Sequence, residues 1–397
     1  MKTWVEISGQ RLAANYRLLA ATAGAETTVF AVVKADAYGH GVDLCAPVLS
    51  AAGAGWLGVT DPDEGMAVRA ALQNSGIEQP RVLVMSEMLD EEADEMVEHH
   101  LTPVVSNIRQ MESLARAAGQ RPSSPFPIHL EIDTGMARQG VPVGDALDTV
   151  LRWLSSQSVI RLEGMMTHFA SAEIAGSHQT SAQRRLFEQT IHQIHSAGLQ
   201  PAWIHAGNSS TVDNPAGEPL HWLEQLARSL NARAMVRTGL ALYGYSLPVE
   251  REQDYAGDAQ SLVQPGLEPV MTWKARVTGV REVEAGTRIG YNGTFTAQRH
   301  MRLALLPVGY ADGLRRELSS TNGRAGGWVL FGQARAPIVG RVSMNLTIVD
   351  ITGLPAVAVG DEAVLLGEGI TAEDHAHLAG TIAYEILCGV RAVRCLR

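Results

Sequence analysis

Short apolar runs alternate with helix-like segments along residues 28–238 of the chain. Eight of these runs have the length and composition of buried strands, at 28–34, 55–60, 81–86, 101–106, 127–133, 162–168, 202–206 and 234–238. The segments between them favour helices, at 42–52, 63–73, 91–99, 109–118, 143–155, 179–196 and 222–230. Strands buried on both faces are near-continuous apolar runs, and most of these runs have that form. The alternation predicts an α/β fold with an N-terminal (β/α)8 barrel of the TIM type.

The pattern changes at about residue 245. Residues 246–269 are polar, contain glycine and proline, and predict a connector. Short strands with turn signals follow at 270–280, 302–307, 328–330, 336–342, 346–350 and 363–366, with one helix near 371–378. We therefore predict a barrel over 1–244 and a mostly-β C-terminal domain over 245–397. The first strand, near 3–8, is a candidate to pair with the C-terminal domain.

Polar side chains gather at the carboxyl ends of the predicted barrel strands. Lys34, Asp133, His168, Asn208 and Arg237 stand at or just past an apolar run. Capping of helix N-termini accounts for an aspartate or an asparagine there, but much less well for a lysine, a histidine or an arginine. In a TIM barrel this end of the strands carries the catalytic residues.

Lys34 is the most informative of these residues. Desolvation at the end of a buried strand lowers the pKa of a lysine and makes its amine a usable nucleophile and base. The alternative is a lysine that extends from the strand end to the surface, which is the usual fate of a lone lysine. The other polar strand ends favour the first interpretation.

Composition and net charge argue against a protein that binds nucleic acid or membranes. The formal net charge is -10, with 46% hydrophobic and 19% charged residues. Nucleic acid and membrane surfaces are therefore poor candidates as partners. Cys45, Cys388 and Cys395 have no metal-type spacing and fit a reducing compartment, so we expect a cytoplasmic protein without a metal site. There is no apolar signal region and no apolar run of membrane length.

Motifs in both predicted domains occur together in one order. They are AVVKADAYGHG around Lys34, HLEIDTGMARQG, MMTHFASAE, IHAGNSS, VRTGLALYG, IGYNGTFTA, LPVGYADGLRR, GRVSMNLTIVD and IAYEILCG. This set resembles the alanine racemase family, the barrel-type (fold-type III) pyridoxal phosphate enzymes. The resemblance extends from Trp4 to Cys388.

The resemblance implies a two-base racemisation of a small amino acid, L-alanine to D-alanine, that feeds peptidoglycan precursors. Lys34 would hold pyridoxal 5'-phosphate and act on one face of the substrate, and Tyr291 of the partner subunit would act on the other. His168 and Arg237 match the hydrogen-bond chain behind that tyrosine. A head-to-tail homodimer with shared active sites is implied.

Other residues match family positions around the cofactor and the substrate. Those expected to bind the cofactor are Tyr38, Arg138, His168, Asn208, Ser209, Arg237, Gly239, Leu240 and Tyr384. Those expected at the substrate are Arg138, Met344 and Tyr310, with supporting roles for Glu131, His205, Asp312 and Asn345. Arg237 matches the residue that faces the pyridine nitrogen, and an arginine cannot readily accept a proton there.

Two positions depart from the family pattern. Glu131 stands where many members have a lysine that becomes carbamylated, and we hypothesise that it orients Arg138 by a charge-assisted hydrogen bond. Asn345 replaces the usual aspartate near the substrate entrance, which leaves a serine or broader-specificity racemase open.

A decarboxylase and a non-catalytic cofactor carrier are the two alternatives to a racemase. Barrel-type pyridoxal phosphate decarboxylases carry a Cys-Glu-Ser motif, whereas here Cys388 precedes Gly389 and Cys395 precedes Leu396. Non-catalytic cofactor carriers resemble the barrel but lack a second domain.

Overall fold

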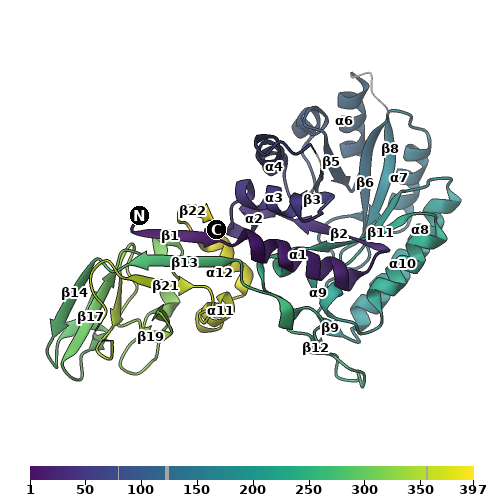
Figure 1. Ribbon diagram of the computed structural model, residues 1–397. Helices are drawn as coiled ribbons and strands as arrows, with labels where there is room; N and C mark the ends of the chain where they lie inside the picture. The colour runs from purple at the N-terminus through teal and green to yellow at the C-terminus, as the bar shows by residue number, and fades with distance from the viewer. Residues whose placement is uncertain (79, 121–124, 355) are drawn as a thin grey trace. The chain divides into compact units, whose positions relative to one another are not determined.

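The computed structural model describes residues 1–78, 80–120, 125–354 and 356–397 (Figure 1). The chain forms two units. The barrel unit contains residues 12–37 and 45–268, and the β unit contains 1–11, 38–44 and 269–397.

Eight parallel strands form the barrel, and all eight predicted strands are among them. They are β2 (Thr27–Val32), β3 (Trp56–Val59), β4 (Arg81–Val84), β5 (Leu101–Val105), β6 (Phe126–Asp133), β8 (Ile160–Met166), β10 (Trp203–His205) and β11 (Arg233–Thr238). Each strand pairs with the next in sequence, β5 pairs with β6, and β11 returns to β2, so the sheet closes. The predicted (β/α)8 barrel is confirmed.

Helices connect the strands and lie outside them (Figure 1). They are α3 (Val42–Ala51), α4 (Pro62–Asn74), α5 (Ala93–Glu98), α6 (Ile108–Gly119), α7 (Asp145–Ser155), α8 (His178–Ser196) and α10 (Pro219–Ser229), each within a few residues of a predicted helix. Four of the described helices were not predicted: α1 (Gly9–Ala23), α2 (Lys34–Gly39), α9 (Ser209–Asp213) and α12 (Ala383–Gly389). The spacing of the buried Leu12, Tyr16 and Leu19 is a helical signal for α1.

The β unit contains a six-stranded and a three-stranded sheet. The larger has the order β19 (Ala334–Pro337), β18 (Trp328–Phe331), β21 (Glu362–Leu366), β13 (Met271–Arg276), β1 (Thr3–Ile7) and β22 (Arg394–Leu396). The smaller has the order β14 (Gly279–Val283), β17 (Met301–Leu306) and β20 (Thr347–Asp350). A two-stranded sheet of β15 (Arg288–Ile289) and β16 (Phe295–Thr296) and the helices α11 (Ala372–Ala379) and α12 (Ala383–Gly389) also belong to this unit. As anticipated, β1 pairs with the C-terminal part of the chain, antiparallel to β13.

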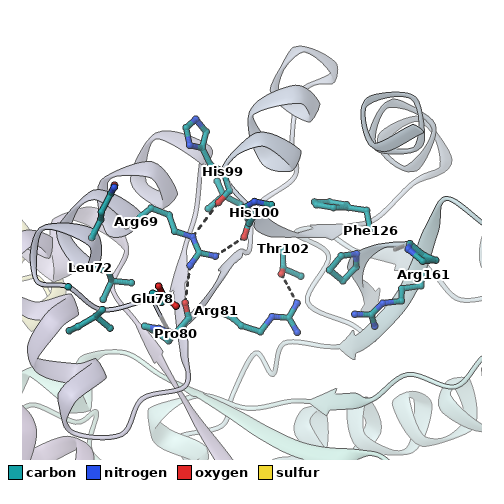
Figure 2. A pocket seen from close by; sticks show the side chains of 16 residues that line it. Arg69, Leu72, Glu78, Pro80, Arg81, His99, His100, Thr102, Phe126 and Arg161 are labelled. Carbon is teal, nitrogen blue, oxygen red and sulfur yellow. Dashed lines mark hydrogen bonds between the residues drawn. The ribbon is translucent and has the colours of Figure 1, made fainter. Parts of the chain in front are cut away.

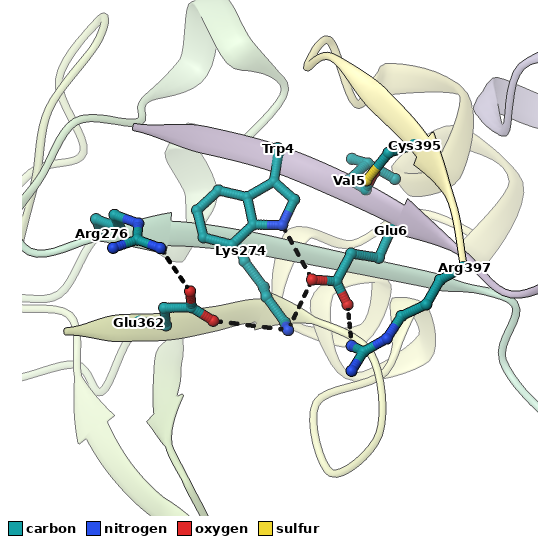
Figure 3. A network of polar contacts seen from close by, with 8 residues as sticks. All are labelled: Trp4, Val5, Glu6, Lys274, Arg276, Glu362, Cys395 and Arg397. Atoms are coloured by element: carbon teal, nitrogen blue, oxygen red, sulfur yellow. Dashed lines mark hydrogen bonds and ion pairs between the residues drawn. The ribbon is translucent and has the colours of Figure 1, made fainter. Parts of the chain in front are cut away.

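Polar contacts around Glu6 hold both chain ends in the β unit (Figure 3). Glu6 accepts hydrogen bonds from the Trp4 indole at 3.0 Å, Lys274 Nζ at 2.9 Å and Arg397 NH1 at 2.5 Å. Burial opposes ionisation of Glu6, but these donors outweigh it and lower the pKa of the carboxyl. The network therefore ties β1 and the last residue of the chain to β13.

The division between the units differs from the predicted boundary at 244/245. Residues 245–268 belong to the barrel unit because Asp213 binds them: its carboxylate accepts from Ser246 Oγ at 2.7 Å and from the Val263 backbone N–H at 2.8 Å. The short strand β12 (Glu250–Arg251) also pairs with β9 (Ile174–Ala175). The polar composition of this segment hid these contacts, which depend on a buried carboxylate distant in sequence.

Among the described residues, no helix combines the length and the apolar character that crossing a membrane requires.

Candidate active site

The carboxyl ends of the barrel strands bring the predicted polar residues to one mouth. β2 and β11 are neighbours, with Arg237 opposite Phe30 and Thr238 opposite Ala31, so Lys34 and Arg237 follow adjacent strands. Arg237 NH2 lies 3.1 Å from His168 Nδ1, and the charges of Arg237, Arg138 and Lys34 all lower the pKa of His168.

Lys34 begins a strained turn that the sequence did not predict. The next four residues, Ala35, Asp36, Ala37 and Tyr38, all have φ between 53° and 54°. Non-glycine residues rarely adopt this left-handed conformation, and each pays of order 1–2 kcal/mol for it. Such strain persists only where the surrounding structure imposes it, and here it fixes how the chain leaves Lys34.

Glu64 braces this turn. Its carboxylate accepts from the Ala35 N–H at 2.5 Å, and from the Thr60 N–H and hydroxyl at 2.8 and 2.9 Å. Glu64 lies on α4, whose N-terminus is capped by Asp61. The Glu64 side chain thus joins the end of β3 to the residue after Lys34. Nothing in the sequence indicates this role, because it depends on contacts between residues that are distant in the chain.

Arg237 is buried and bound by neutral acceptors. It is 4% exposed, and its NH2 donates to the Thr167 carbonyl at 2.7 Å and to His168 Nδ1 at 3.1 Å. Its NH1 lies 3.2 Å from His205 Nδ1. Burial lowers the pKa of Arg237 to about 10, with Glu131 opposing and Arg138 reinforcing that shift. Arg237 therefore stays protonated at neutral pH.

His168 is neutral in this environment. Burial, then the charges of Arg237, Arg138 and Lys34, lower its pKa to about 3. Because Arg237 can only donate, His168 Nδ1 is the acceptor and the imidazole proton sits on Nε2. His168 can thus donate from Nε2 to a further group at the mouth.

Glu131 forms a different contact from the one predicted. It is 2% exposed, and its hydrogen bond within the described residues comes from the Gln139 amide, which also donates to the Met85 carbonyl at 2.7 Å. Arg138 is exposed and influences Glu131 only through its charge. The hypothesised direct bond from Glu131 to Arg138 is therefore corrected: Glu131 binds the residue that follows Arg138.

The segment that carries Arg138 is folded back along β6. Asp133 Oδ1 accepts from the backbone N–H groups of Gly135, Met136 and Ala137 at 2.9, 3.0 and 3.1 Å. The strand β7 (Val141–Pro142) then pairs with the end of β6. Arg138 is thereby presented from a loop that is fixed on both sides.

Backbone N–H groups meet where the β10 and β11 loops join. Ser209 Oγ accepts from the Gly239 N–H at 3.0 Å and the Ala241 N–H at 3.4 Å, which links the start of α9 to the turn that begins at Leu240. Asn208 caps α9 by accepting from the Thr211 N–H at 3.3 Å. Helix N-termini at this position in a barrel favour an anion such as a phosphate.

The residues predicted in the β unit form their own group of loops. The Tyr310 N–H donates to the Ser343 carbonyl at 3.0 Å, and the Ala311 N–H donates to Met344 at 2.9 Å. Tyr291, Tyr310 and Met344 are 67%, 44% and 55% exposed.

Four further residues of this unit were also predicted for the site. Asp312 accepts from the Gly309 N–H at 2.9 Å and so stabilises its own turn. The rings of Tyr38 and Tyr384 lie 5.9 Å apart, centroid to centroid. Asn345 is exposed beside Met344.

A separate cavity of about 980 Å³ lies at the opposite end of the barrel strands, near the starts of β4, β5 and β6 (Figure 2). Its Arg69 is committed to the carbonyls of His99, Pro80 and His100, at 3.3, 3.0 and 2.7 Å. Size does not make this cavity the catalytic site, since barrel chemistry takes place at the carboxyl ends of the strands.

Comparisons with known proteins match both parts of the chain. The family described as "Alanine racemase, N-terminal domain" matches residues 7–247, and "Alanine racemase, C-terminal domain" matches 270–396. The alanine racemase of Halothermothrix orenii is 36% identical over 392 residues, 98% of this chain and 94% of that protein. The one from Sorangium cellulosum is 36% identical over 401 residues, 98% and 96% of the two chains.

Solved structures agree with these matches. The alanine racemase from Streptomyces coelicolor A3(2) has a TM-score of 0.86 at 33% identity, covering 100% of this chain and 97% of that one. The alanine racemase from Bartonella henselae with covalently bound pyridoxal phosphate has a TM-score of 0.81 at 26% identity, covering all of both chains.

Gln139→Leu tests the contact with Glu131. Removing the amide leaves a buried carboxylate without its donor, so we expect the unfolding free energy to fall by about 1–3 kcal/mol. Chemical denaturation measures this loss. Gln193→Leu is the matched control, because Gln193 donates to Asp148 at an exposed site at 2.6 Å and should cost under about 0.5 kcal/mol. Equal effects of the two substitutions would refute a special role for Gln139.

Acid should destabilise the apo-protein through His168. Its folded pKa of about 3 lies below the unfolded value of 6.5, so the unfolded state binds more protons between these values and stability falls as the pH is lowered. The slope for one such group reaches about 1.4 kcal/mol per pH unit. Denaturation from pH 7 to 5 should give a flatter profile for His168→Asn than for the parent protein or for the exposed His178→Asn control. Identical slopes would show that His168 protonates freely in the folded state.

Proposed function

Because the chain belongs to the alanine racemase family, we propose that it interconverts L- and D-alanine with pyridoxal 5'-phosphate held on Lys34. The observation that carries the proposal is the barrel mouth, where Lys34 and Arg237 follow the neighbouring strands β2 and β11 and Arg237 NH2 lies 3.1 Å from His168 Nδ1. The two alternative functions have less support. The Cys-Glu-Ser motif of the barrel-type decarboxylases does not occur in this sequence, and the chain has the second domain that non-catalytic cofactor carriers lack.

The residues fit the cofactor. The start of α9 at Ser209, whose Oγ accepts from the Gly239 N–H, suits a phosphate. Lys34, which follows the neighbouring strand β2, supplies an amine for a covalent bond. Pyridoxal phosphate, when bound, delocalises the electrons released from the substrate Cα–H bond and so acidifies that proton. The roles of Asn208, Leu240, Tyr38 and Tyr384 around the phosphate stay predictions.

Arg237 is assigned to the pyridine nitrogen. Its guanidinium donates and cannot accept, so it holds that nitrogen without giving it a proton. This makes the electron sink weaker than a carboxylate partner would, which restrains side reactions such as transamination. Arg138 is assigned to the substrate carboxylate, which suits an exposed cation on a fixed loop.

Racemisation requires a proton to leave one face of Cα and another to arrive on the opposite face. Lys34 serves one face, and we assign the other to Tyr291 of a second subunit. His168 supports this role because its Nε2–H can stabilise a tyrosinate by donating to it. Exposure of Tyr291, Tyr310 and Met344 in the single chain favours a homodimer in which a second subunit covers them.

Substrate breadth and location complete the proposal. We assign alanine first and serine second, since Asn345 lacks the charge of the family's aspartate. A cytoplasmic location is supported by the three cysteines, Cys45, Cys388 and Cys395, which are scattered and have no metal-type spacing.

Lys34→Ala should abolish covalent retention of the cofactor and lower racemisation at least about a thousandfold, because the amine supplies both the bond and a base. Borohydride reduction followed by proteolysis and mass spectrometry identifies the modified lysine. Lys2→Ala is the control and should retain both properties. Labelling at Lys2 or Lys274 would contradict the assignment.

Tyr291→Phe should retain the cofactor's visible absorption but slow Cα–H exchange of L-alanine by about 10²–10⁴-fold, the usual loss for a general base. Exchange of D-alanine, which depends on Lys34, should be much less affected. Proton NMR in deuterated water measures both rates. Normal exchange of L-alanine would defeat the two-base assignment.

Mixing the Lys34→Ala and Tyr291→Phe proteins tests the shared site. If each subunit supplies Tyr291 to the other, a mixed dimer has one intact site, and activity should return after subunit exchange. A mixture as inactive as its parts would place both bases on one chain.

A further inference from the structure

A line of buried polar side chains continues from Arg237 into the barrel, beyond the groups that the mechanism uses. His205 on β10 follows Arg237, then His129 on β6, then Glu163 on β8, and the three are 0%, 0% and 5% exposed. His129 Nδ1 lies 2.8 Å from His205 Nε2, and His129 Nε2 lies 3.6 Å from Glu163 Oε2. Polar groups are costly in a barrel core unless each has a partner, so the line needs an explanation.

Arg237 fixes the direction of this line. A guanidinium only donates, so His205 Nδ1 accepts from Arg237 NH1. A neutral His205 then carries its proton on Nε2 and donates it to His129 Nδ1. His129 must carry its own proton on Nε2, which faces the Glu163 carboxylate. His205 thus has one tautomer that satisfies both neighbours. His129 Nε2 has no hydrogen-bond partner among the described residues and faces the Glu163 charge across 3.6 Å.

Both histidines are neutral. Burial, then the charges of His129 and Arg237, lower the pKa of His205 well below its usual value. Burial also lowers the pKa of His129, although Glu163 opposes that shift. The negative charge in the line therefore resides on Glu163, two rings away from Arg237.

A β-bulge places Glu163. Ile128 pairs with Leu162 but His129 pairs with Gly164, so Glu163 is the extra residue on β8. Bulges redirect side chains and are frequent near active sites. Gly164 is required beside it, because a Cβ there would lie 2.5 Å from the His129 ring.

Two arginines keep Glu163 ionised. Arg81 NH2 lies 2.5 Å from Oε2, and Arg161 NH2 lies 2.8 Å from Oε1. Burial opposes ionisation, but contacts with His129, Arg81 and Arg161 bring the pKa of Glu163 well below its usual range. Arg81 is itself held over the Trp56 ring, 4.2 Å from its centroid.

We propose that Glu163 and His129 are positioning residues for racemisation, which fix the tautomer of His205 and so hold Arg237 in its donating orientation. This inference rests on the proposed function for its kinetic consequence. The Glu163 charge acts on His129 across 3.6 Å, and His129 in turn accepts from His205, so polarisation along this line strengthens His205 as an acceptor. Three of the five guanidinium N–H groups of Arg237 are thereby bound, and the described residues leave the other two for a ligand.

Tautomers are read directly by ¹⁵N NMR of the histidine-labelled protein, with and without pyridoxal phosphate. We expect His129 and His205 to be neutral with the proton on Nε2 from about pH 6 to 9. Spectra of His129→Phe and His205→Phe assign the signals. An imidazolium, or an Nδ1–H tautomer at either residue, would overturn the proposal whatever the enzyme does to alanine.

Glu163→Gln tests the consequence in the holoenzyme. We expect kcat to fall about ten- to a hundredfold in both directions, with KM for alanine changed less than about threefold, and His205 to show a mixture of tautomers. Glu163→Asp, which keeps the charge, should recover most of kcat. Glu26→Gln is the control, since Glu26 pairs with Arg228 on the barrel surface at 3.5 Å and should change neither quantity.

Unchanged kcat and unchanged His205 signals in Glu163→Gln would refute the positioning role. A parent protein that does not racemise alanine, but shows the expected tautomers, would refute the proposed function alone. If Glu163→Gln fails to fold, the tautomers of the parent protein and the Glu163→Asp kinetics still decide the question.

Discussion

The barrel mouth depends on one constraint, a permanently charged guanidinium buried at the end of β11. Arg237 is 4% exposed, and a charge in that position must be bound by acceptors. The acceptors that bind it are a carbonyl and two imidazole nitrogens, all uncharged. His168 and His205 must therefore be neutral and must present Nδ1. The mouth keeps a positive potential that suits a phosphate ester and a substrate carboxylate, although the whole chain has a net charge of -10.

A second requirement is that the amine of Lys34 starts from a fixed backbone. Four consecutive left-handed residues after Lys34 store strain that a flexible loop would release. Glu64 opposes that release by binding the Ala35 N–H and both donors of Thr60. This rigidity limits the positions that the Lys34 amine can reach, and small displacements of a reacting group are costly in proton transfer.

The sequence predicted the fold well because the barrel signal is local. Apolar runs and helical spacing are properties of neighbouring residues, and strands such as 127–133 and 234–238 lie within a residue or two of β6 and β11. The site residues at strand ends followed from the same signal, because parallel strands bring their carboxyl ends together. The predicted boundary at 244/245 was wrong because it depends on tertiary contacts. Asp213 accepts hydrogen bonds from Ser246 and Gln264, and no pattern within the polar segment between them indicates a partner so far away in the sequence.

The length of the side chain explains why Glu131 does not form the predicted hydrogen bond with Arg138. The Glu131 side chain is shorter than a carbamylated lysine, so its carboxylate ends nearer to β6. Its carboxylate meets the Gln139 amide instead, one residue beyond Arg138, and Gln139 is anchored at the Met85 carbonyl. The anion thus acts on the loop rather than on the guanidinium. Arg138 is exposed, so it can follow a substrate carboxylate while its backbone stays fixed by Gln139 and Asp133. The carboxylate at 131 therefore positions the loop that carries Arg138 through the hydrogen-bond donor at residue 139.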